Sequence, residues 1–218
     1  EYTDEIEYYY DVTAPVITLT YSDTEPTKED VTVTASANDT VCEVTFNTVT
    51  EKVFTANGEF EFSAIDEAGN IARVTAKVEN IDKTIPEITI SSEQFDGKKY
   101  KEAEFKITGK DENGISLIEY SVNGSDEFEV AENGIAVLNN DDGVFYITAR
   151  VTDGVGNVNT SNSANVNLDN TAPIGSVTYT PATRTAQNVT AMFSANEAVT
   201  VTNNDAKTSY MFEDNGEF

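Results

Sequence analysis

Aspartate and asparagine side chains recur between the apolar stretches of this chain, where their oxygens are able to bind a hard cation. Two sets stand out, each drawn from three separate stretches of sequence. The first set is Asp11, Asn38, Asp39, Asp66 and Asn70, and the second is Asp82, Asp111, Asn113, Asp153 and Asn157. Oxygen-only ligands suit calcium rather than zinc or copper. The residue types are therefore compatible with two calcium sites, and apart from calcium at these sites we expect no cofactor.

The same aspartates have a second interpretation, as turn residues. Asp66 and Asp153 each begin an Asp-x-x-Gly-Asn segment. In such a turn the aspartate accepts bonds from backbone N–H groups, and the Gly-Asn pair tolerates positive φ. Any β-rich chain needs turns of this kind, so the sequence favours the turn interpretation and keeps calcium binding as the alternative.

Side chains that commonly carry catalysis are missing from the sequence. The chain has no histidine and no tryptophan, and it has a single cysteine. Without histidine the commonest general base is absent, and neither a Cys-His nor a Ser-His-Asp arrangement can be assembled. Paired carboxylates hydrolyse glycosides, but a pair has little diagnostic value among 39 acidic residues. We expect no enzyme activity.

Tyr8, Tyr9 and Tyr10 form a run of aromatic residues near the start of the chain. Sugar-binding modules stack their ligands on aromatic platforms. Carbohydrate binding or adhesion through exposed tyrosines is therefore the alternative function, with host or cell-wall glycans or proteins as partners. Three rings in a row would lie on both faces of a strand, so packing at an interface explains the run equally well.

The charge of the chain excludes several classes of partner. Thirteen basic and 39 acidic residues leave a formal net charge of −26 and an isoelectric point near 4.1. No basic stripe is present to displace counterions from nucleic acid, and anionic membrane surfaces would repel the chain. No apolar run has the length of a membrane span. Cys42 alternates with Val44 and Phe46, so we expect it to be buried on the apolar face of a strand.

An internal repeat organises the sequence. The motif Asp-x-Thr-x-Pro begins at Asp11, Asp82 and Asp169, with spacings of 71 and 87 residues. Residues 13–60 and 171–218 align without a gap, and 18 of these 48 positions are identical. Apolar residues alternate with threonines within each unit, a period of two that predicts half-buried antiparallel strands.

The predicted fold is all-β, with tandem immunoglobulin-like β-sandwich domains in an elongated array. Four dipeptides favour turns, namely Asn57-Gly58, Asn123-Gly124, Asn133-Gly134 and Asp142-Gly143. The middle repeat adds a hairpin around Tyr120–Val130 and Ile135–Leu138. Two loops of such a sandwich lie at the same end as the entering linker, so each acidic set should gather at one end of a domain. The predicted divisions are 1–12 (the final strand of a preceding repeat plus a linker), 13–82 (first domain), 83–169 (second domain) and 170–218 (an incomplete third domain).

These motifs resemble a known group. Asp-Asn-Thr-Ala-Pro, Ser-Ala-Asn-Glu, Asn-Gly-Glu-Phe and Asp-Glu-Ala-Gly-Asn are similar to the bacterial Ig-like (Big-type) repeats of cell-surface, adhesive and polysaccharide-degrading proteins of Gram-positive bacteria. The resemblance implies an extracellular spacer or stalk that holds an adhesive or catalytic module away from the cell wall. Its immediate partners would be neighbouring repeats of the same chain. The simplest expectation is an excised piece of a longer array.

Overall fold

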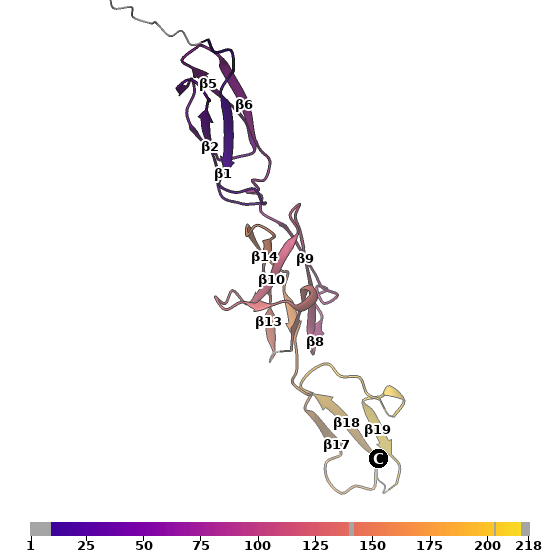
Figure 1. Cartoon of the computed structure of the whole chain (residues 1–218). Coiled ribbons are helices and arrows are strands. Elements are labelled where there is room, and N and C mark those ends of the chain that lie inside the picture. The colour runs from indigo at the N-terminus through magenta and orange to yellow at the C-terminus, as the bar shows by residue number, and fades with distance from the viewer. Residues whose placement is uncertain (1–9, 140–141, 203, 215–218) are drawn as a thin grey trace, which may run out of the picture.

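The fold is almost entirely β-strand. The computed structural model describes residues 10–139, 142–202 and 204–214. Three groups of strands follow one another along a single long axis (Figure 1), and we call them the first unit (β1–β6), the second unit (β7–β16) and the third unit (β17–β19). No helix among the described residues has the length and apolar character needed to cross a membrane.

The first unit is an immunoglobulin-like sandwich of two three-stranded sheets. β1, β2 and β4 form one sheet, and β3, β5 and β6 form the other. This is the A-B-E and C-F-G arrangement of an immunoglobulin fold, which confirms the fold class predicted from the sequence. The strands are β1 (Val16–Tyr21), β2 (Val31–Asn38), β3 (Val44–Phe46), β4 (Glu51–Phe54), β5 (Gly58–Asp66) and β6 (Ile71–Val78).

The core of this unit follows from the alternation along its strands. Val31, Val33 and Ala35 of β2 are at most 5% exposed, whereas Thr34 and Ser36 face solvent. Opposite them, β5 and β6 contribute Phe62 and Ala76, both fully buried. Burying a side chain as large as that of Phe62 stabilises the fold by roughly 1.5–3 kcal/mol.

The second unit has the same plan with more strands. β7, β9 and β12 form one sheet, and β11, β10, β14 and β15 form the sheet opposite. A third sheet, β13-β16-β8, contains a parallel pair between β16 and β8. The strands are β7 (Glu87–Ser91), β8 (Lys99–Tyr100), β9 (Ala103–Lys110), β10 (Ile115–Val122), β11 (Glu129–Val130), β12 (Ile135–Leu138), β13 (Gly143–Phe145), β14 (Ile147–Asp153), β15 (Val158–Asn162) and β16 (Val166–Leu168). A short 3₁₀ turn, η1 (Glu132–Gly134), precedes β12.

Two details of the predicted turns differ in the structure. The Tyr120–Val130 hairpin forms between β10 and β11, but Ile135–Leu138 pairs with β9 instead of extending it. The expected Asn57-Gly58 turn has no positive φ among its residues. Since β4 and β5 belong to different sheets, this segment crosses between sheets and needs no tight hairpin turn. The Asn57 amide instead exchanges two hydrogen bonds with the backbone of Ile81, at 2.9 and 2.8 Å.

The third unit is a single antiparallel sheet among the described residues. It consists of β17 (Gly175–Thr180), β18 (Val189–Ala195) and β19 (Ser209–Phe212), with a 3₁₀ turn, η2 (Asn204–Ala206), before β19. Its strand pairing repeats that of β1-β2-β4 at an offset of 158 residues. Thus Leu19 pairs with Ala35 as Val177 pairs with Phe193.

Candidate metal centres

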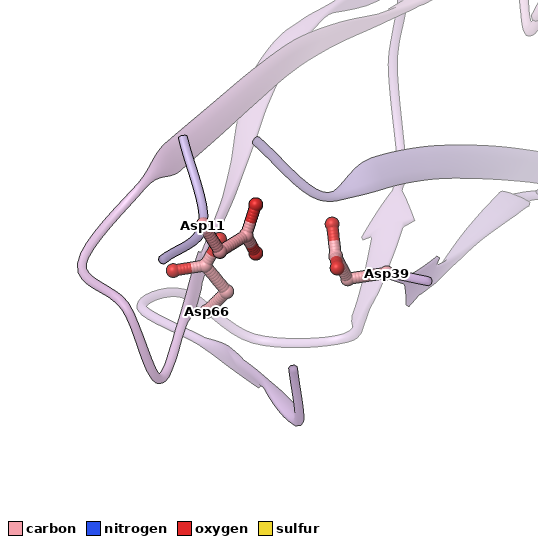
Figure 2. Close-up of side chains that lie close together, drawn as sticks. All are labelled: Asp11, Asp39 and Asp66. Carbon is pink, nitrogen blue, oxygen red and sulfur yellow. The ribbon is translucent and has the colours of Figure 1, made fainter. Parts of the chain in front are cut away.

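Asp11, Asp39 and Asp66 converge at the end of the first unit where the chain enters it. One carboxylate oxygen of each residue lies within 4.8 Å of one oxygen of both others. Asp11 belongs to the linker, Asp39 follows β2, and Asp66 ends β5. Figure 2 shows the three side chains gathered from these separate parts of the chain. Carboxylate oxygens brought together in this way are the donors that calcium takes.

Asp66 is held by the turn that follows it. The side chain is 5% exposed, and its Oδ1 accepts a hydrogen bond from the backbone N–H of Asn70 at 2.8 Å. The Asn70 amide donates to Asp66 Oδ2 at 2.9 Å and to the carbonyl oxygen of Asp11 at 3.3 Å. Gly69 has a φ of +93°, which the turn requires and which other residues rarely adopt. Asp66 therefore has the turn role that its sequence motif indicates.

Asp11 is fixed by the threonine of its own motif. Its Oδ1 accepts from the backbone N–H of Thr13 at 2.9 Å and from the Thr13 hydroxyl at 2.6 Å. These bonds favour the ionised carboxylate, so they lower the pKa of Asp11 below its ordinary value. The Asp-x-Thr spacing of the repeated motif thus has a local physical cause, which the sequence reasoning did not identify.

Cys42 does not lie on a strand, contrary to the sequence-based expectation. It precedes β3 and is only half-buried. Its Sγ donates to Asp11 Oδ2 at 3.3 Å. Burial and the neighbouring Asp11 carboxylate both raise the pKa of the thiol. The alternation with Val44 and Phe46 breaks down here because Asp39 Oδ1 accepts the N–H of Val41 at 2.8 Å and that of Cys42 at 3.3 Å, which draws residues 39–42 into a loop.

Asp82, Asp111 and Asp153 form an equivalent cluster where the chain enters the second unit. Their carboxylate oxygens also lie within 4.8 Å of one another, and Asp153 is fully buried. Asp153 Oδ1 accepts from the N–H groups of Val155 and Asn157, at 2.9 and 2.8 Å. The turn role predicted for Asp153 is thus present in the second unit as well.

Asparagine amides link the members of this second cluster. Asn157 Nδ2 donates to Asp153 Oδ2 at 2.8 Å and to the carbonyl oxygen of Asp82 at 3.1 Å. Asn113 Nδ2 donates to Asp82 Oδ2 at 2.7 Å. In the first cluster the Cys42 thiol makes the corresponding bond to Asp11 Oδ2. Bonds from Thr84 and then from Asn113 lower the pKa of Asp82. Both clusters therefore carry ionised linker aspartates at neutral pH.

The remaining predicted site residues are Asn38 and the tyrosine run. Asn38 is exposed at the end of β2, beside Asp39. Tyr10 directly precedes Asp11 and is 89% exposed. Tyr8 and Tyr9 lie outside the described residues.

The third linker is held differently from the first two. Asp142, which the sequence marked only as a turn residue, accepts the N–H of Thr171 at 3.1 Å and its hydroxyl at 2.5 Å. Asp169, the motif aspartate, is instead 2.7 Å from Lys99 Nζ. No repeat signal could identify Asp142, because it lies 27 residues before the motif.

The junction between the first and second units contains a further contact that sequence patterns do not reveal. The linker is tied to the first unit by Asp82 N–H donating to the Thr27 carbonyl at 2.8 Å. Lys28 Nζ then reaches across the junction and donates to the Gly156 carbonyl oxygen at 2.8 Å. The two units are therefore joined by more than their covalent linker.

Comparison with known proteins supports no family assignment. No known protein-family profile and no curated protein matches the chain. Among solved structures it is similar to the fibronectin(III)-like modules of Clostridium thermocellum CbhA, with 14% sequence identity, 70% of this chain and 93% of that chain covered, and a TM-score of 0.34. The immunoglobulin-like assignment therefore depends on the order and pairing of this chain's own strands.

Proposed function

We propose that this chain is a non-catalytic spacer of a bacterial surface or secreted protein, which holds an adhesive or catalytic module away from the cell wall. The observation that carries the proposal is the arrangement of three β-units along one axis (Figure 1). A compact binding domain does not need an elongated shape, whereas a spacer functions by its length.

The linkers support a spacer that keeps its shape. At the first junction Lys83 Nζ lies 2.6 Å from Asp30, in addition to the Lys28–Gly156 bond. At the second, Asp142 and Lys99 hold residues 169–171 against the second unit. The Lys28–Gly156 bond spans two units and must break before they can swing freely, whereas the contacts at the second junction fix the linker to the second unit.

The composition is taken together with the motifs in proposing a bacterial surface. A net charge of −26 keeps chains apart in solution, and a single cysteine leaves no internal disulfide to form. Together with the resemblance of the motifs to bacterial Ig-like repeats, this favours a bacterial surface rather than an animal receptor.

Calcium binding is a second candidate property of the same linkers. Three carboxylates converge within 4.8 Å at the entrance of both the first and the second unit. Each cluster combines one linker aspartate with two from the unit that follows, so an ion held there would join linker and unit. Calcium takes six to eight oxygens, so each cluster would need further oxygen ligands from the backbone, the neighbouring asparagines or water.

Small-angle scattering of the full chain tests the spacer proposal. A compact protein of this length has a radius of gyration of about 17 Å, and an extended rod must exceed it clearly. A value near the compact one would refute the proposal. A glycan array is the matched test of the alternative: saturable binding that is lost on Tyr8, Tyr9 and Tyr10→Ala would make the chain a carbohydrate-binding module.

A further inference from the structure

One face of the third unit is apolar and open to solvent. Residues that lie directly opposite each other on neighbouring strands point to the same face of a sheet. On this face Val177 of β17 pairs with Phe193 of β18, and Ala191 of β18 pairs with Tyr210 of β19. Val177 is 51% exposed and Tyr179 is 54% exposed, and among the described residues of the third unit none is buried. The opposite face carries hydroxyls, including Ser176 and Ser194 at 2.9 Å. The sheet is therefore amphipathic, and no second sheet among the described residues covers its apolar side.

The first unit shows what covers the equivalent face. At the 158-residue offset, Val31, Val33 and Ala35 correspond to Val189, Ala191 and Phe193. The first three are at most 5% exposed because β5 and β6 lie over them, while the second three are only half-buried.

A tyrosine connects the two sheets of the first unit. Tyr21 Oη accepts a hydrogen bond from the backbone N–H of Lys77, in β6, at 3.3 Å. The residue at the same position of the third unit is Tyr179. A backbone N–H from a strand laid across the face is thus the partner that this hydroxyl takes in the first unit.

Two of the differences on this face exchange a large residue for a small one and a small residue for a large one. Ile17 and Ala35 of the first unit become Gly175 and Phe193 in the third. A Cβ at Gly175 would lie 2.6 Å from the Phe193 ring, so the ring occupies the space next to the glycine backbone. The loss of the isoleucine side chain is thus offset by the gain of the phenylalanine ring, and such volume-conserving changes preserve a packing surface. A face in permanent contact with water would not need its volume to be conserved.

The face also forms a hollow free of negative charge. Its volume is about 500 Å³, and none of the described residues that line it is acidic. Residues 170–218 contain five acidic and two basic side chains, against thirteen and four in residues 13–82. An apolar strand with acidic outer residues, such as β5 with Glu59 and Glu61, meets no repulsion from carboxylates here.

We propose that the apolar face of β17, β18 and β19 is a docking surface for a two-stranded β-hairpin of the β5–β6 type. The hairpin presents alternate apolar side chains, like Phe62 and Ala76, to the hollow and a backbone N–H to Tyr179. The β5–β6 hairpin is the occupant that the first unit places on the equivalent face, and a second copy of the β17-β18-β19 sheet is the competing occupant.

The chain supplies its own probe. Asn57–Phe60 and Asn215–Phe218 have the same four residues, so residues 61–82 can be added directly after Phe218 in the register of the first unit. Hydroxyl-radical footprinting then measures exposure residue by residue. We expect a several-fold lower modification rate at Tyr179, Phe193 and Tyr210. Met192 and Met211, each 53% exposed and on the opposite face, are the internal controls and should not change.

Two versions of the added segment test specificity. Phe62→Asp with Ala76→Asp places charges on its apolar side and should abolish the protection. Glu61→Gln with Arg73→Gln removes only an exposed ion pair and should preserve it. Unchanged rates at Tyr179, Phe193 and Tyr210 with the unaltered segment would overturn the proposal. So would protection in the unextended chain that rises with concentration alongside a dimer in sedimentation, because a second copy would then be the occupant.

Discussion

Lys28 and Gly156 are 128 residues apart in sequence, yet the lysine ammonium donates to the glycine carbonyl at 2.8 Å. Gly156 belongs to the Asp153–Asn157 turn, whose other end forms the second acidic cluster. One surface turn therefore serves both the junction between two units and the candidate metal centre.

Removal of this contact should loosen the junction without unfolding either unit. We expect Lys28→Ala to broaden the distance distribution between spin labels placed on the first and second units. Double electron–electron resonance measures this distribution, in a Cys42→Ser background that leaves only the introduced cysteines to be labelled. Lys106→Ala removes the same charge from the exposed side of β9 and is the control. Equal distributions in both variants would mean that the linker alone sets the geometry.

Calcium should raise the melting temperature if the acidic clusters bind it. A ligand specific for the folded state stabilises by about 2.7 kcal/mol when its free concentration is about 100 times Kd. Asp39→Asn with Asp111→Asn should abolish the shift, because each cluster loses one negative charge that calcium needs. The turns should remain intact, since the amide oxygens still accept the backbone hydrogen bonds. Asp126→Asn, in an exposed loop, should leave the shift intact. Melting curves that ignore both calcium and chelator would leave only the turn role.

Acid should destabilise the chain below about pH 4. Hydrogen bonds to their ionised forms lower the pKa of Asp11, Asp82 and Asp142 from 3.8, and bonds from Lys98 lower that of Asp96 to about 2. A pKa that is lower in the folded state adds stability above the unfolded value of 3.8, and this stability is lost as pH falls through the folded value. Denaturant titrations from pH 6 to pH 2 measure the effect.

Asp142→Asn tests this account at one site, because an amide at position 142 does not titrate. The variant should lose part of the pH dependence and show a loosened third linker. A pH profile identical to that of the natural chain would contradict the assignment.

The same substitution, Phe to Ala, should have unequal costs in the first and third units. Phe62 is fully buried, so Phe62→Ala should cost roughly 3–5 kcal/mol. Phe193 is only half-buried, and Phe193→Ala should cost about 1 kcal/mol, near the average for point changes. Hydrogen exchange resolved by unit is the suitable measurement, since multi-domain chains do not unfold in two states. Similar costs at the two sites would show that the face of the third unit is already covered in solution.

The sequence alone was sufficient to predict the all-β immunoglobulin-like fold and the separate stretches that supply Asp11, Asp39 and Asp66. Alternation of apolar residues with threonines has a period of two, and that period is a property of the strand backbone itself. The motif aspartates lie where strands end, so the sandwich topology brings them to one end of a unit. The boundaries of the domains and the calcium ligands stay predictions.

Only the tertiary structure decided which side chains complete each linker. Cys42 contacts Asp11, and Asp142 takes over the threonine of the third motif from Asp169. The open face of the third unit likewise could not be read from Val189 and Phe193, whose alternation equals that of buried strands. Periodicity specifies which side of a strand is apolar. The segment that covers that side is decided by the packing of residues far apart in the chain, and local backbone geometry does not encode this packing.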